Sequence, residues 1–169
     1  PQRCGIAHYS HNLAQTMARL CSRSLSLMVL SERREWITSN SFRDGRVIVE
    51  RAWKRRGLGS WLTASSRIVS FKPHIVHVQH EYGLFGAWMG LSYLLLLTVA
   101  RLLRSKVVVT LHSVCPSNPV SLGGRLSSLR GRCAVRLTTR GMRLLAHEFV
   151  CHTETQRRWL LDVHRFDPR

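Results

Sequence analysis

The part of the sequence that most constrains the fold is the segment around Ile75–Val78, which begins as a short, mainly apolar run and leads into polar residues and glycines. A run of this kind is typical of a strand buried on both faces of a parallel sheet. His80 and Glu81 follow closely, and Gly83 and Gly86 then permit backbone conformations that other residues avoid. In open α/β sheets, ligands bind beyond the carboxyl ends of the strands. We therefore expect this strand end to border a ligand site.

A second apolar run, Lys106–Leu111, predicts another buried strand, and it ends at His112. Between the two runs lies Tyr82–Ala100, which is nineteen residues without a charge. That length is compatible with a membrane-spanning helix. However, three glycines fall in its first half, and Arg101 and Arg104 follow it, as cations do at helix C-termini. We therefore favour a buried crossover helix over a transmembrane span. Such a crossover predicts that the strands at 75–79 and 107–111 are parallel neighbours, with Gln79 and His112 at the same edge of the sheet.

The remaining sequence alternates between helical and strand patterns. Apolar residues at spacings of three and four predict an amphipathic helix near the N-terminus, with a stripe of Ile6, Tyr9, Leu13, Met17 and Leu20. We also predict strands at 25–30, 47–49 and 148–151, a loop or edge region at 31–45 and a connection at 51–59. Helices are predicted at 61–71, 122–146 and 153–163, the last opened by a capping box of Thr153 and Gln156. Such alternation predicts an α/β fold, a Rossmann-like parallel sheet with helices on both faces, in a single domain over residues 1–169.

The charge balance restricts the partners of the protein. The sequence has 26 Lys and Arg residues against 9 Asp and Glu, a net charge of +17, and its pI is about 11.5. Such an excess implies a polyanionic partner, either nucleic acid or an anionic membrane surface. The alternative is compositional, because nearly all the basic residues are arginine, which the base composition of a genome can favour. The five cysteines are widely spaced and contain no C-x-x-C pair, which predicts a reducing, cytoplasmic location.

Three segments together resemble a known family. Pro1–Ala7, His77–Gly86 and Val108–His112 occur in the order found in the N-terminal domain of GT-B glycosyltransferases, and they are most similar to the family-4, glycogen-synthase-like retaining enzymes. The resemblance implies an enzyme that transfers a sugar from a nucleotide-sugar donor to a lipid-linked or polysaccharide acceptor. It also implies that this chain is the acceptor-side domain truncated at both ends, without the first central strand and without the C-terminal donor-binding domain. We expect such a fragment to be inactive by itself, because the groups that stabilise the leaving diphosphate would be missing.

The resemblance assigns roles to four residues. Gly5 would face the diphosphate of the donor at a helix N-terminus, the alternative being a plain turn glycine. His112 would be catalytic, contacting the donor sugar or positioning the acceptor, the alternative being a structural histidine at a strand end. His80 and Glu81 would bind the acceptor or shape the crevice, although Glu81 is equally suited to accept backbone hydrogen bonds within its loop.

Metal binding is not expected, and the resemblance implies no other cofactor. His74, His77 and His80 are spaced by three residues, which suggests a zinc site. Side chains alternate between the two faces of a strand, so His77 points away from the other two and the three ligands cannot converge.

The predicted helix at 122–146 carries a row of arginines on one face: Arg125, Arg132, Arg136, Arg140 and Arg143. No acidic residue occurs between Glu81 and Glu148. This face is suited to an anionic membrane that holds a lipid-linked acceptor, which would make the protein peripheral on the cytoplasmic face. The alternative is a solvated helix face. A nucleic-acid-binding module is the rival interpretation, but no zinc-finger, RNA-recognition or helix-turn-helix signature accompanies the charge.

Overall fold

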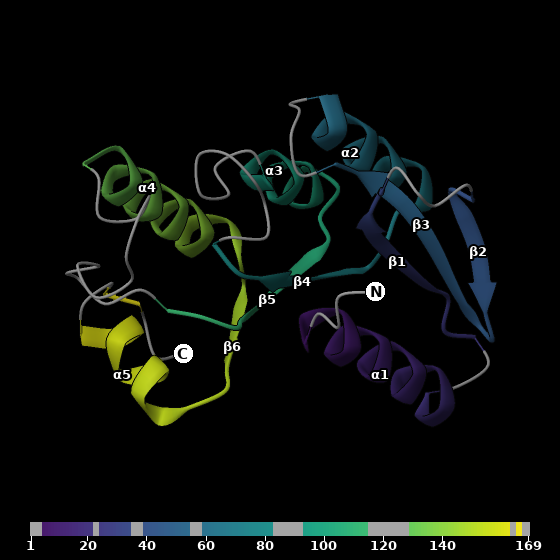
Figure 1. Cartoon of the computed structure of the whole chain (residues 1–169), viewed down its shortest axis with the longest axis horizontal. Coiled ribbons are helices and arrows are strands. Elements are labelled where there is room, and N and C mark those ends of the chain that lie inside the picture. The colour runs from purple at the N-terminus through teal and green to yellow at the C-terminus, as the bar shows by residue number, and fades with distance from the viewer. Residues whose placement is uncertain are drawn as a thin grey trace. The chain divides into compact units, whose positions relative to one another are not determined.

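The computed structural model describes residues 5–21, 24–34, 39–54, 59–82, 93–114, 129–162 and 165–166 (Figure 1). The chain divides into two compact units, Pro1–Ala64 and Ser65–Arg169, which are presented separately. Strands and helices alternate along the chain, and the predicted α/β, Rossmann-like fold class is confirmed. The prediction of a single domain over residues 1–169 is not tested by the structure and stays a prediction.

The first unit holds helix α1 (Gly5–Leu20), a three-stranded mixed sheet and the first residues of α2 (Gly59–Phe71). Helix α1 packs against β1 (Leu27–Glu32) and β3 (Val47–Trp53). The strand order is β1-β3-β2, with β1 parallel to β3 and β2 (Ser41–Asp44) antiparallel to it. The mixed pairing departs from the all-parallel sheet expected from the sequence.

A tight turn joins β2 to β3 and also anchors α1. Gly45 has a φ of 60°, a conformation that residues with a Cβ rarely adopt, and it stands first in the two-residue turn. The Gln15 side chain donates a hydrogen bond to the carbonyl of Asp44 at 3.2 Å. Arg46 donates to the carbonyl of Ala18 at 2.6 Å. Two side chains thus tie the helix to the turn.

Several expectations for this unit are corrected by the structure. Strand β2 lies inside the stretch predicted as a loop or edge region, and it is an edge strand of the sheet. Strand β1 begins and ends two residues later than expected. Strand β3 continues to Trp53, because Trp53 is buried and stacks on Trp61 of α2 (Gly59–Phe71) with ring centroids 5.4 Å apart. Leu20 was placed on the apolar stripe of α1 but is 81% exposed, and Ala18 is the buried residue at that end.

The second unit contains a fully parallel sheet in the order β4-β5-β6. Its elements after α2 are β4 (Ile75–His80), α3 (Leu94–Leu102), β5 (Lys106–Leu111), α4 (Leu129–Leu145), β6 (Glu148–Cys151) and α5 (Glu154–Asp162). The register pairs Gln79 with Thr110, and Leu111 with Cys151. The predicted parallel pairing of the strands at 75–79 and 107–111 is therefore confirmed.

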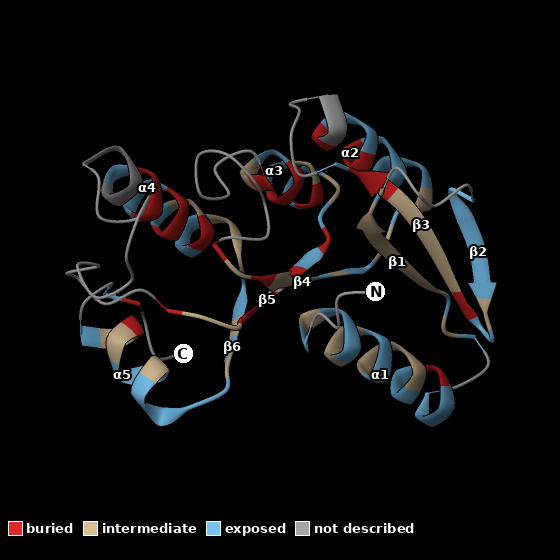
Figure 2. Ribbon diagram, in the orientation of Figure 1, coloured by how far each residue is buried: buried red, intermediate tan, exposed pale blue. Residues whose placement is uncertain are grey.

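The core of the second unit lies on one face of this sheet. Val107, Val109 and Leu111 alternate along β5 and are almost completely buried, and α3 packs against both β5 and α4 (Figures 1 and 2). The opposite face of the same strands is more polar, and it carries Gln79 and Thr110. Helix α5 packs against β6, where Phe149 meets Phe166 edge to face with centroids 4.6 Å apart.

Helices α3 and α4 approach each other closely. A Cβ added to Gly141 of α4 would overlap the methyl groups of Leu94 of α3, so glycine permits this approach. Helix α3 ends in a Schellman motif: Arg104 adopts a φ of 61° and its N–H donates to the carbonyl of Arg101, while Ser105 donates to Ala100. An arginine therefore occupies a position that usually favours glycine.

The crossover helix favoured from the sequence is present as α3, which connects two parallel neighbours, β4 and β5. Within the parts of the chain that the structure describes, no helix is long and apolar enough to cross a membrane. Residues 83–92 of the uncharged segment lie outside the described residues.

Candidate functional site

The carboxyl ends of β4, β5 and β6 meet at one edge of the parallel sheet, and polar side chains gather there. His112 directly follows β5, and its Nε2–H donates a hydrogen bond of 2.9 Å to the Oε1 of Gln79 on β4. On its other side, the His112 ring lies 4.8 Å from the ring of His152, which follows β6. The prediction that Gln79 and His112 share this edge is confirmed. His112 thus connects all three strand ends.

Gln79 extends this arrangement into a hydrogen-bonded row along the polar face of the sheet. Its Nε2 donates to the Nε2 of His77 at 3.3 Å, and the hydroxyl of Thr110 donates to the same nitrogen at 2.8 Å. The two imidazoles therefore fix the amide orientation of Gln79 from opposite sides. With this orientation, His112 carries its proton on Nε2 and His77 accepts on Nε2.

Both histidines of the row favour the neutral form. Burial, and secondly the neighbouring His152, lower the pKa of His112. Burial also lowers the pKa of His77. Neutral imidazoles serve as hydrogen-bond donors and acceptors rather than as fixed positive charges. Such groups suit sugar hydroxyls, or a phosphate that receives its charge balance from elsewhere.

A side chain from α5 holds the end of β5 in place. The Nε2 of Gln156 donates to the carbonyl of His112 at 3.2 Å, and its Oε1 accepts from the N–H of His152 at 2.9 Å. Thr153 caps the helix, because its hydroxyl accepts from the N–H of Gln156 at 3.1 Å. The expected cap is confirmed, although Gln156 reaches the N–H of His152 rather than that of Thr153. The cap therefore also positions His112 and His152.

His80 lies away from the expected crevice, whereas the expected role of Glu81 stays a prediction. His80 is completely buried on the core face, where its ring lies 4.8 Å from Tyr82 and 5.1 Å from Tyr93. Burial, and secondly His112, lower the pKa of His80 to about 3. A fully buried neutral imidazole cannot contact an acceptor sugar in this conformation, so the structure places His80 in the core. Glu81 is half-buried directly after β4.

Gly5 is the first residue of α1, as expected for a turn that enters a helix. Among the described atoms, none lies within 4 Å of a Cβ added there. Steric crowding by these atoms therefore does not explain the glycine. Helix N-termini carry N–H groups without partners inside the helix, which is the general basis of the expected role of Gly5.

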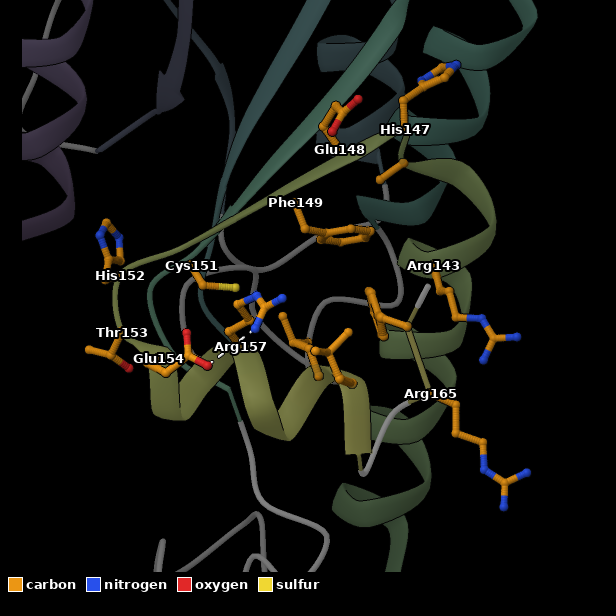
Figure 3. A pocket seen from close by; sticks show the side chains of 14 residues that line it. Arg143, His147, Glu148, Phe149, Cys151, His152, Thr153, Glu154, Arg157 and Arg165 are labelled. Carbon is orange, nitrogen blue, oxygen red and sulfur yellow. Dashed lines mark hydrogen bonds and ion pairs between the residues drawn. The ribbon is translucent and has the colours of Figure 1, made fainter. Parts of the chain in front are cut away.

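A groove of about 710 Å³ opens next to the strand ends, between β6, α5 and the C-terminal end of α4 (Figure 3). Phe149, Cys151 and Arg157 point into it, whereas Arg143 and Arg165 extend outward on its far side (Figure 3). Burial raises the pKa of the Cys151 thiol, although Arg157 acts in the opposite sense. The thiol therefore stays protonated near neutral pH and is not an activated nucleophile.

The five predicted arginines of the basic helix are only partly described. Arg136, Arg140 and Arg143 lie on α4 and are exposed. Arg125 and the side chain of Arg132 lie outside the described residues.

His77 and His80 lie on opposite faces of β4, as the alternation along a strand requires. In the described part of the chain, no three His, Cys, Asp or Glu side chains gather as a metal site would need.

The cluster also contains residues that the sequence did not single out as site residues: His77, Gln79, Thr110, His152 and Gln156. Strand pairing could have identified Gln79 and Thr110, since they are in register and each precedes a strand end.

No family model matches the chain, and no curated protein or solved structure is detectably similar to it.

Proposed function

We propose that this chain is the acceptor-side domain of a retaining glycosyltransferase of the GT-B fold, similar to family 4. In this proposal, the complete enzyme transfers a sugar from a nucleotide-sugar to a lipid-linked or polysaccharide acceptor. The observation that carries the proposal is the position of His112. It follows a central parallel strand, hydrogen-bonds to Gln79 of the neighbouring strand, and lies at the edge where α/β folds bind ligands.

The chemistry of this edge supports a role in positioning and hydrogen bonding. His112 presents a neutral imidazole whose orientation is set by Gln79 from one strand and by Gln156 through its backbone carbonyl. In this tautomer Nδ1 of His112 is a hydrogen-bond acceptor, so a sugar hydroxyl is the partner that suits it, and an acceptor held in place in this way orients the sugar for transfer. In the same proposal, Gly5 offers the N-terminus of α1 to the donor diphosphate, and Glu81 contributes to acceptor binding.

The test is sugar transfer by the protein that includes the donor-binding domain implied by the resemblance. A panel of radiolabelled nucleotide-sugars is incubated with lipid-linked and polysaccharide acceptors, and the product is separated from free donor. We expect transfer with at least one pair and retention of the anomeric configuration. We expect none from the 169-residue chain alone, because the resemblance places the groups that neutralise the diphosphate on the other domain. The absence of transfer with every pair would contradict the proposal.

The proposal also includes a peripheral location on the cytoplasmic face of a membrane, where a lipid-linked acceptor would be found. What supports it is the run of exposed arginines on α4, which is examined next as a binding surface.

A further inference from the structure

The outward side of α3 and α4 exposes leucines that a folded domain normally buries. Leu102 is 78% exposed and Leu144 is 76% exposed, and Leu137 and Leu95 are 53% and 42% exposed. Other residues of both helices are buried, such as Leu97 and Ala100 of α3 and Met142 of α4, and α3 packs against β5 and α4. The exposed leucines therefore do not contribute to the hydrophobic core of the second unit.

The four leucines lie on the same outward side. Gly141 of α4 faces Leu94 of α3 where the helices cross. Leu137 and Leu144 lie one turn before and one turn after Gly141, so they border the crossing. Leu95 and Leu102 are seven residues apart, share a helix face, and lie next to Leu94 on the side away from the buried residues. The crossing thus places one apolar strip across both helices.

Arginines flank this strip on α4. Arg140 lies beside Leu137 and Leu144 on the helical wheel, and Arg136 and Arg143 follow on the outer flank, all three exposed. The sequences of α3 and α4 contain no acidic residue. We refer to these leucines and arginines together as the leucine–arginine surface: Leu95, Leu102, Leu137, Leu144, Arg136, Arg140 and Arg143.

We propose that the leucine–arginine surface binds an anionic lipid bilayer, with the leucines at the boundary of the acyl chains and the arginines at the phosphates of the head groups. Charge complementarity selects this occupant. A second copy of the same surface would bring arginines against arginines, which is unfavourable. Nucleic acid would pair with the arginines but leave the leucines in water. Anionic lipid satisfies both kinds of side chain at once.

This inference rests on the peripheral location included in the proposed function but not on the transfer reaction, because binding to vesicles requires neither donor nor acceptor, so the two can fail separately. The experiment measures sedimentation of the full 169-residue chain with sucrose-loaded vesicles. One set is pure phosphatidylcholine and the other contains about one third phosphatidylglycerol. We expect binding to the anionic vesicles only, and weaker binding as salt is raised, because salt screens the contacts of the arginines.

Variants separate the two kinds of contact. Replacing Arg136, Arg140 and Arg143 together with glutamine should weaken binding about 100-fold, since each basic residue near an anionic surface contributes roughly fivefold. Leu137→Ser with Leu144→Ser should weaken it on the order of tenfold, because less apolar area enters the interface. All these positions are exposed, so far-ultraviolet circular dichroism should show unchanged folding.

A charge-matched control tests whether the site is local. Arg157→Gln with Arg158→Gln removes two positive charges from α5, and Arg136→Gln with Arg140→Gln removes the same charge from α4. We expect the α4 pair to lose at least fivefold more affinity than the α5 pair. Equal losses would mean that overall charge drives binding, and the proposal would be wrong.

Binding of duplex DNA, measured for the same variants, distinguishes a lipid-binding surface from a general polyanion site. If DNA binds more tightly than the anionic vesicles, and the leucine pair affects neither, then the surface is a general polyanion site. Equal binding to neutral and anionic vesicles would also overturn the proposal. Loss of vesicle binding in the leucine pair, with DNA binding unchanged, would support it.

Discussion

Acid is expected to destabilise the folded protein through one buried side chain, His80. This imidazole is completely buried against Tyr82 and Tyr93. Its burial, and secondly the nearby His112, lower its pKa from 6.5 to about 3. The unfolded chain therefore takes up a proton near pH 6.5 that the folded chain does not bind until about pH 3. Stability is at its full value above the unfolded pKa, and it falls as the pH is lowered from there towards the folded pKa.

The size of the effect follows from this difference in proton binding. Between about pH 7 and about pH 5, the unfolded state gains nearly one proton at His80, and the free energy of unfolding should fall by about 2 kcal/mol. This figure requires only that the folded pKa lies well below 5. The lowered pKa values of His77 and His112 add to the loss in the same direction. The free energy of unfolding of a typical domain is about 5–15 kcal/mol, so a change of this size is readily measured.

The assay is urea denaturation followed by circular dichroism at a series of pH values, for the wild type and for His80→Gln. The variant has no titrating group at this position, so its free energy of unfolding should fall by about 2 kcal/mol less over the same pH interval. This comparison holds even if the variant is less stable at neutral pH. His77→Gln serves as a matched variant on the polar face and should flatten the curve less. If His80→Gln keeps the full pH dependence of the wild type, the buried neutral imidazole is not its origin.

Three further predictions concern catalysis, a helix end and a turn. In the complete enzyme, His112→Ala should lower kcat and kcat/KM together by roughly ten- to a thousandfold in steady-state kinetics with an unchanged melting temperature, whereas near-normal kcat/KM would reject the catalytic role. Arg104→Gly should raise the free energy of unfolding by about 0.5–1 kcal/mol, because glycine adopts the left-handed backbone conformation of this position without strain. Arg101→Gly, one turn earlier in the helix, should lower it by about 1 kcal/mol, and a change of the same sign in both variants would refute this explanation. Gly45→Ala should cost about 1 kcal/mol in urea denaturation through backbone strain, because an added Cβ would meet only Oε1 of Gln15 at an ordinary contact distance of 3.8 Å; Gly45→Asn should cost less, and equal costs would refute strain as the cause.

The sequence predicted the parallel sheet of the second unit better than the mixed sheet of the first. Strands β5 and β6 have the predicted bounds, because each is an apolar run with charged or polar residues at its ends. Strand β2 was not predicted, since Ser41–Asp44 is short, mostly exposed and without a clear alternation. Its signal was instead Gly45, because glycine is favoured at the first position of a two-residue hairpin turn, where φ is positive. The continuation of β3 to Trp53 depends on its stacking with Trp61, which no local pattern reveals.

The candidate site was predictable in position but not in composition. Strand ends in the sequence identify Gln79 and His112 as neighbours, because parallel strands end at a common edge. The same alternation excludes His80 from the face of Gln79, since consecutive residues of a strand point to opposite sides. The contacts of Gln156 with His112 and His152 could not be derived, because they depend on how α5 starts after β6.

The two sheets also differ in how their strands find each other during folding. Strands β2 and β3 are joined by the two-residue turn at Gly45, and a hairpin of this kind forms within about 1–10 μs. Strand β4 pairs with β5 only after residues 81–105 have been brought back across the sheet, so the chain entropy of that closure opposes the first contact. The first unit can therefore begin folding locally and use β3 as the template for β1. Among its described strands, the second unit has no hairpin to start from, and the pairing of β4 with β5 forms only as α3, which links them, packs against β5.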